Sequence, residues 1–410
     1  MQFLSLDQWL DSEHRVRIVW QYVESLDLTE LYEQIRAVEG HVGRDAVDPR
    51  ILFALWMFAT IEGVSSARRL NDLTKRDIPY MWICGGVSVN HRLVSEFRAQ
   101  HGALLERLMI DSIGVLIHQN LVTLETVAQD GMRVRANAGT DSFRRSATLA
   151  EALKQAEEHV ETLKAKQQAD PAGDNRRKQA AQQRAAEDRL KRIKQAQDHL
   201  AEVKAQREKL KRDTEQTRAS TTDPDARHMK MPCGGFRPAL NVQFATDGET
   251  RLIVGVEVNN QGSDAGLMAP MHAKLSEDYA KVPENYLVDG PYATCDDVTQ
   301  LEEAGTAVHA PLSKEAQQLA AGKDPYARKR DDNDQMAAFR ARMGTPAAKE
   351  LYKQRPSIAE FPNADCRNRA LQQFRVRGAL KAKSQAMWHV LSFNFLRFLN
   401  LGYLEVVIKG

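Results

Sequence analysis

Apolar residues recur with a helical period in the first quarter of the chain and again near its end. The period is clear in residues 51–70 and 104–119, and residues 65–98 add a basic helix, a Gly-Gly turn and a further short helix. These patterns predict an all-helical N-terminal domain over residues 1–115.

A two-residue period begins at residue 124. Residues 124–137 alternate apolar and polar side chains, which predicts a strand pair or one strand bent at Gly131, with Asp130 in its middle. Residues 236–248 and 251–259 predict a hairpin that turns at an Asp-Gly pair. Two further short strands are expected in residues 285–290 and 305–312.

Residues 146–218 differ sharply in composition, being rich in Ala, Gln, Glu, Lys and Arg. Each half carries one narrow apolar stripe, and a turn is expected at residues 169–175. Neither stripe is wide enough to fold alone, so the segment predicts an inserted antiparallel helical hairpin. The stripes are Leu149, Leu153, Ala156, Val160 and Leu163, and Leu190, Ile193, Leu200, Val203 and Leu210.

Residues 332–401 return to a helical pattern, and residues 385–399 are apolar on most sides, as in a core helix. The order of elements predicts a mixed α/β domain, built from residues 116–145 and 219–401, that the hairpin interrupts. Residues 402–410 are expected to form a C-terminal tail.

Composition and charge narrow the class of protein. With 410 residues, of which 42% are hydrophobic and 27% charged, the chain is long enough for two or three cores. Lys+Arg (57) and Asp+Glu (55) nearly cancel, so a nucleic-acid surface would need local clustering of cations. The four cysteines form no C-x2-C pair. No signal peptide or membrane-spanning stretch is recognised, so we expect a cytoplasmic protein.

Three carboxylates are candidates for phosphodiester chemistry with Mg²⁺, which prefers hard oxygen ligands. Asp130 lies on the first expected strand and Asp289 at the end of another, although a lone Asp after a strand is usually a turn or cap residue. Residues 352–367 contain the pattern Y-x2-R-x4-E-x6-R, formed by Tyr352, Arg355, Glu360 and Arg367. An ordinary amphipathic helix would also account for this pattern.

Several long motifs, in order along nearly the whole chain, resemble the DDE transposases of bacterial insertion sequences, in the subgroup with a Tyr, Arg, Glu signature on the last catalytic helix. The motifs are VDPRILFALWMFATIEGVSSARRLNDL, DGMRVRANAG, DPDARHMKMPCGGFRPALNVQFATD, LIVGVEVNNQGSDAGLMAPM, YLVDGPYAT and the segment that holds the signature.

The resemblance implies a ribonuclease-H-like catalytic domain in which Asp130, Asp289 and Glu360 bind two Mg²⁺ ions, for which Mn²⁺ can substitute. Such an enzyme binds the terminal repeats of its element, cleaves the ends and joins the 3′-OH to target DNA. The accessory positions fall on Tyr352, with Arg355 and Arg367 as phosphate contacts. A nucleoid-associated enzyme that acts on double-stranded DNA is implied.

The chain departs from the family at three points. Arg367 stands where the family usually has Lys, and Pro291 replaces a common Gly. Pro356 and Pro362 bracket Glu360, so a helix is expected to begin only around the glutamate.

DNA contacts are expected in the N-terminal domain, where cations cluster locally. A solvated helical face is the alternative for such scattered cations. The hairpin is suited to clamp DNA or, with slight preference, to pair two subunits in a homodimer on paired ends. The predicted contacts are Arg68, Arg69, Lys75, Arg76, His91, Arg92 and Arg98.

Two other functions are open. One is a transposase-derived DNA-binding protein that no longer cleaves, against which the three intact acids argue. The other is a ribonuclease-H-like nuclease, which the N-terminal helices and the long insertion fit less well.

Overall fold

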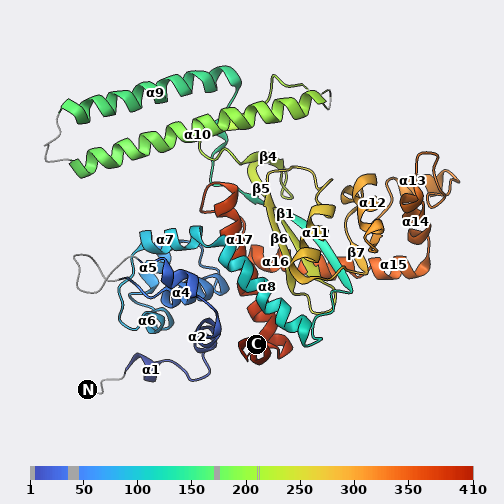
Figure 1. Cartoon of the computed structure of the whole chain (residues 1–410), viewed down its shortest axis with the longest axis horizontal. Helices are drawn as coiled ribbons and strands as arrows, with labels where there is room; N and C mark the ends of the chain where they lie inside the picture. Colours follow the sequence, from blue (N-terminus) through green and yellow to red (C-terminus); the bar gives the residue numbers. More distant parts are fainter. Residues whose placement is uncertain (1–4, 36–45, 170–175, 210, 212, 410) are drawn as a thin grey trace.

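Helices form both ends of the chain, and a mixed sheet lies between them (Figure 1). The computed structural model describes residues 5–35, 46–169, 176–209, 211 and 213–409. The N-terminal helices are α1 (Leu6–Trp9), α2 (Arg15–Ser25), α3 (Thr29–Glu33), α4 (Pro49–Ile61), α5 (Ala67–Leu73), α6 (Ile78–Cys84), α7 (His91–Gln100) and α8 (Gly102–His118).

The sheet has six strands in the order β4–β5–β1–β7–β8, with β6 also paired to β5. β1 runs parallel to β7, and β7 to β8, whereas β4, β5 and β6 form antiparallel pairs on the other side of β1. The strands are β1 (Thr126–Arg135), β4 (Arg227–Lys230), β5 (Phe236–Asp247), β6 (Ile253–Asn259), β7 (Asn285–Leu287) and β8 (Ala307–His309). The predicted β5–β6 hairpin is confirmed.

β1 is one continuous strand, so the alternative of a strand pair is wrong. The side chains of Gln243 and Asn241 on β5 pack closely against Gly131. A Cβ at this position would lie 2.2 Å from Gln243 Nε2 and 2.9 Å from Asn241 Oδ1. A larger residue at position 131 would therefore have to displace the polar side chains that β5 extends across β1.

Helices cover both faces of the sheet. On one face, α11 (Met268–Tyr279) packs against β6, where Met271 and Leu275 approach Gly255. On the other face, η3 (Pro356–Glu360) and α16 (Phe361–Asn368) pack against β1 and β5.

The remaining elements complete the α/β part of the chain. They are η1 (Thr140–Ser142), η2 (Gly290–Tyr292), α12 (Cys295–Glu303), α13 (Glu315–Ala320), α14 (Asp334–Met343), α15 (Pro346–Tyr352), α17 (Ala379–Leu401) and α18 (Leu404–Lys409).

The long helix α17 joins the N-terminal helices to the sheet. It packs against α4, α7 and α8 on one side and against β6 on the other, and its central residues are buried as predicted. One hydrophobic core therefore continues from the N-terminal helices to the sheet. Within the expected C-terminal tail, α18 is a short helix whose Leu404, Val407 and Ile408 pack against that core.

The inserted segment forms two helices, α9 (Ser146–Ala169) and α10 (Arg176–Lys209), that lie side by side (Figure 1). Leu149, Ala156, Ile193 and Leu200 form a small core between them. At their base, β2 (Phe143–Arg144) pairs with β3 (Ala219–Ser220). The turn predicted at 169–175 lies, apart from its first residue, outside the described residues.

Candidate active site

Asp130 lies on β1, and Asp289 follows the end of the neighbouring parallel strand β7 at the same level. Ala128 of β1 is paired with Leu287 of β7, and each aspartate follows its strand residue by two positions. Because alternate residues of a strand share a face, both carboxylates lie on the side of the sheet that η3 covers. The structure thus brings together two acids that are 159 positions apart (289 − 130).

The helical segment that covers this face begins before Glu360, not at it. Ile358 and Ala359 bury against the apolar residues of β1 and β7. Pro356 starts η3, and Pro362 lies in the first turn of α16. Proline lacks an N–H and its ring collides with the carbonyl four residues earlier in an α-helix. A wider π-helical turn before Pro362 relieves that collision, so the helix runs through Glu360 despite the two prolines.

Arg355 links the two aspartates. Its Nη2 lies 3.1 Å from Asp130 Oδ1 and its Nη1 lies 2.9 Å from Asp289 Oδ1. The side chain of Arg355 is only 5% exposed, whereas that of Asp130 is 20% and that of Asp289 is 50% exposed. The arginine predicted to contact phosphate is therefore a buried partner of both carboxylates.

Asn363 is the site residue that the sequence pattern missed. Its Nδ2 donates a 2.7 Å hydrogen bond to Asp130 Oδ2, and its buried Oδ1 finds no partner among the described residues. Asn363 follows Arg355 by eight positions, about two helical turns, and this spacing was the available signal. Both carboxylate oxygens of Asp130 are thus engaged by one helical segment.

Burial raises the pKa of Asp130, and the nearby Asp289 carboxylate adds to the increase. The Arg355 guanidinium opposes both effects, as does the hydrogen bond from Asn363. Two like charges in one site favour a cation between them, and Arg355 meets that need.

Glu360 lies at the junction of η3 and α16, with an exposed side chain. In an α-helix, five residues turn through about 500°, which would set Glu360 about 140° away from Arg355. The π turn, whose hydrogen bonds span five residues, returns it toward that face. Within the described residues, no three His, Cys, Asp or Glu side chains lie close enough to hold a metal ion together. Glu360 therefore does not form such a group with Asp130 and Asp289.

Tyr352, at the end of α15, contacts both the core and the site. Its hydroxyl lies 3.5 Å from Asp289 Oδ1, and its ring packs against the main hydrophobic core. Burial raises the pKa of Tyr352 to about 12, with Arg355 opposing and Asp289 adding to the shift. The phenol therefore stays protonated at neutral pH and can donate to Asp289.

The other predicted contacts are distributed over several elements. Arg367 is half-buried in the last turn of α16. The exposed cations of α5, α7 and the loop after α5 are Arg68, Arg69, Lys75, Arg76, His91 and Arg92.

Arg98 has a core position instead of a surface one. It is 4% exposed, its guanidinium lies 4.6 Å from the Trp56 ring, and Nη1 donates to the Ser65 carbonyl. Burial lowers the pKa of Arg98 to about 10. The residue stabilises the packing of α7, because its apolar stem and planar head suit a buried aromatic contact.

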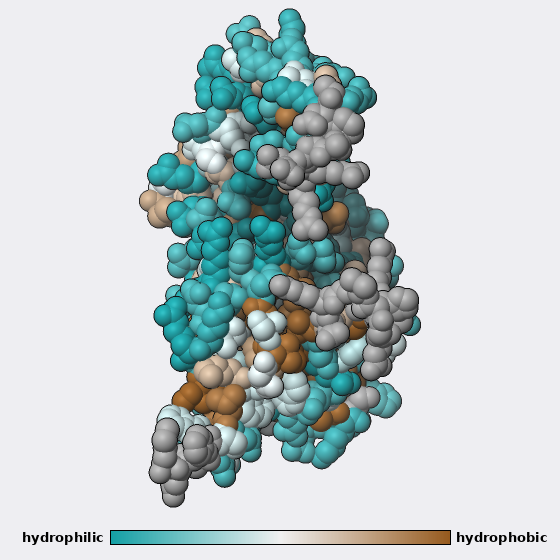
Figure 2. Space-filling model, turned by 90° about the vertical axis from the view of Figure 1, so that its left-hand side faces the viewer, coloured by the Kyte–Doolittle hydropathy of each residue, from teal (hydrophilic) through white to brown (hydrophobic). Residues whose placement is uncertain are grey.

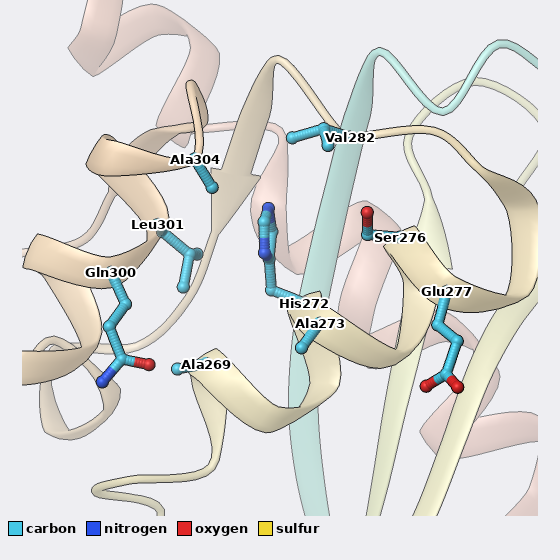
Figure 3. A pocket seen from close by; sticks show the side chains of 9 residues that line it. All are labelled: Ala269, His272, Ala273, Ser276, Glu277, Val282, Gln300, Leu301 and Ala304. Atoms are coloured by element: carbon cyan, nitrogen blue, oxygen red, sulfur yellow. The ribbon is translucent and has the colours of Figure 1, made fainter.

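A separate hollow of about 430 Å³ lies between α11 and α12, on the other side of the sheet (Figure 3). His272 projects between these helices, and its Nε2 lies 2.7 Å from Thr306 Oγ1. Burial lowers the pKa of His272, so its imidazole is neutral at pH 7 and joins α11 to the start of β8.

The comparisons with known proteins bear on the N-terminal helices. Residues 4–100 match a family model described as "Transposase domain (DUF772)". The match supports a transposase family. It covers α1 to α7 and stops before the sheet, so it does not reach Asp130, Asp289 or Glu360. The comparison with curated proteins gave no match, and the comparison with solved structures gave none.

In the described part of the chain, no helix combines the length and the apolar character needed to cross a bilayer.

Proposed function

We propose that the chain is a DNA transposase of the DDE type, in the subgroup with the Tyr-Arg-Glu signature. It binds the terminal repeats of an insertion sequence, cleaves the element ends and joins the 3′-OH to target DNA. Asp130, Asp289 and Glu360 are its catalytic acids. The observation that carries the proposal is the meeting of Asp130 and Asp289 at one level of two parallel strands, in a chain whose N-terminal helices match a transposase domain.

A ribonuclease-H-like architecture for the α/β part belongs to the same proposal. It is supported by the central position of β1, with antiparallel strands on one side and parallel strands on the other. A helical segment from the last third of the chain, η3 and α16, covers the face that carries both aspartates.

The donor chemistry of the site fits the proposed pair of Mg²⁺ ions, with Mn²⁺ as a substitute. Asp130 and Asp289 offer carboxylate oxygens, and Asn363 Oδ1, which has no hydrogen-bond partner among the described residues, is a further hard oxygen close to Asp130. Asp130, Asp289 and Glu360 would hold the ions, which would supply Lewis-acid stabilisation of the reacting phosphodiester. Arg355 now neutralises the same carboxylates, so its ion pairs would loosen on binding.

The chain's own residues keep this site in shape. Arg355 fixes the separation of the two carboxylates, and Asn363 orients Asp130 through a hydrogen bond to Oδ2. Tyr352 limits the rotation of Asp289. Arg367, on the same helical segment, is suited to contact a phosphate that flanks the cut.

The test is to incubate the full chain and Mg²⁺ or Mn²⁺ with a linear DNA that carries both flanks of its gene, together with a labelled target plasmid. Cleavage at the flanks followed by strand joining is expected. Cutting without joining would instead support a nuclease, and binding without cutting would support a DNA-binding protein derived from a transposase.

A matched control uses Glu350→Gln, which removes an exposed acid of α15. It should leave joining unchanged, while Asp130→Asn should abolish it.

A further inference from the structure

A groove of about 790 Å³ runs between α7, α10 and the start of α17. Five cations and three acids line it. The cations come from two distant parts of the sequence, α10 and the segment that follows α16. They are Lys191, Arg192, Arg375, Arg377 and Lys381.

The positive charge of this groove is not balanced within the described part of the chain, where none of its five cations forms an ion pair. Arg192 Nε is buried and has no hydrogen-bond partner there. Burial and the neighbouring Arg377 guanidinium both lower the pKa of Arg192, so two cations face the same space.

The acids do not cancel this excess. Asp225 already accepts a hydrogen bond from the Ala379 N–H at 2.7 Å and lies 3.6 Å from His199 Nε2. Asp188 is near Arg192 but outside ion-pair distance, and Glu96 stands on the α7 wall. Arg377 Nε donates a 3.2 Å hydrogen bond to the Asn137 carbonyl, but its guanidinium forms no ion pair among the described residues. Clustered guanidinium groups without a carboxylate partner bind phosphate oxygens, which the fork of N–H donors matches.

The strand β1 connects the candidate active site to the groove. Asn137 lines the groove, lies two residues beyond the end of β1 and follows Asp130 by seven positions (137 − 130), so the two residues are at most roughly 23 Å apart at about 3.3 Å per residue. Arg375 and Arg377 belong to the segment that pairs with the end of β1, where the Phe374 N–H donates to the Arg135 carbonyl. One strand of duplex DNA places a phosphate about every 3.4 Å along the helix axis, so this span corresponds to at most about seven base pairs.

We propose that this groove holds the phosphate backbone of duplex DNA on the flank of the cut site. The proposal rests on the proposed function and deepens it, because it gives the hairpin a DNA-contacting wall in α10. On the face that Figure 2 shows, hydrophilic side chains predominate over the upper part of the molecule, where the hairpin lies. A protein partner is the competing occupant, and the experiment separates the two.

The experiment measures binding of the full chain to a fluorescein-labelled 30-base-pair duplex of arbitrary sequence by anisotropy, over a series of salt concentrations and without divalent ions. The test variant is Arg192→Gln with Arg377→Gln, which keeps polar side chains in place. Each lost phosphate contact lowers the slope of log K against log [salt] by about 0.9. The double variant should therefore lose about 1.8 from the slope.

Two further double variants provide a second test of the groove and a control outside it. Lys191→Ala with Lys381→Ala removes the outer, exposed cations of the groove and should lower the slope similarly, even if the first variant folds poorly. Lys154→Ala with Arg184→Ala removes two exposed hairpin cations outside the groove and should leave the slope near the wild-type value.

An unchanged slope in both groove variants, with wild-type binding intact, would overturn the proposal. So would a loss of self-association by sedimentation with no change in DNA binding, which would make the groove an interface between copies of the chain. The assay measures DNA binding and no cleavage. It can therefore be interpreted even if the proposed catalytic function is wrong.

Discussion

Removing the Arg355 side chain should lower the free energy of unfolding, because Asp130 and Asp289 then lie close together without a cation between them. Arg355→Ala leaves Asp130, which is 20% exposed, without its cation, and leaves Asp289 beside it. Breaking a buried ion pair by deleting one partner costs about 3–5 kcal/mol. Because Asp289 is half exposed and its pairing is screened by water, we expect the lower end, about 3 kcal/mol of unfolding free energy at pH 7.

The pH dependence of this loss has a definite sign. Burial and Asp289 raise the pKa of Asp130 above 3.8 in the folded protein, and deletion of Arg355 removes a group that lowers it. The folded variant therefore holds a proton more tightly than the unfolded chain. The loss of unfolding free energy in Arg355→Ala should therefore be largest at pH values well above the raised pKa of Asp130. It should become smaller as the pH falls through that pKa toward 3.8.

The assay is urea unfolding of wild type, Arg355→Ala, Asp130→Asn and the double variant, with Arg355→Lys as the control that keeps a charge but cannot bridge both carboxylates. Asp130→Asn removes the carboxylate that Arg355→Ala leaves without a cation. The double variant should therefore regain most of the stability that Arg355→Ala loses. Additive effects, or a loss below about 0.5 kcal/mol for Arg355→Ala, would refute the buried linkage.

Three other changes test separate parts of the structure. Gly131→Ala should lower stability by about 1–3 kcal/mol in urea unfolding, because its Cβ would overlap Gln243 Nε2; wild-type stability would contradict the packing. Replacing residues 146–217 by a two-residue Asn-Gly turn should keep cooperative unfolding, since β2 and β3 already pair at the base, but should weaken DNA binding in the anisotropy assay; insoluble protein would count against it. Asp289→Asn should leave the melting temperature nearly unchanged and lower DNA cutting at least about 100-fold; normal cutting would remove Asp289 from the mechanism.

Much of the fold could be predicted because its signals are local. The alternation in β1, the Asp-Gly turn between β5 and β6 and the two stripes of the hairpin each specify an element from neighbouring residues. The apolar character of α17 likewise predicted its burial. The helix α18, within the expected tail at 402–410, was not predicted, because a short apolar helix is recognised only when its packing partner is known.

The sequence could place Asp130 and Asp289 near each other but could not predict their partners. Asp130 lies on β1 and Asp289 follows β7, whereas the ion pairs of Arg355 depend on how the helical segment crosses the sheet. Arg98 shows the same limit, since its sequence neighbourhood gives no sign that Trp56 will lie beneath it. Contacts between distant residues follow from tertiary packing, which local periodicity does not encode.

Binding of Mn²⁺, followed by the loss of the free-ion signal in electron paramagnetic resonance, tests the central claim most directly. The wild-type chain should bind the ion, and Asp130→Asn with Asp289→Asn should abolish that binding, while Glu350→Gln should leave it unchanged. Equal binding by the wild type and the double aspartate variant would show that these two carboxylates are not the metal site.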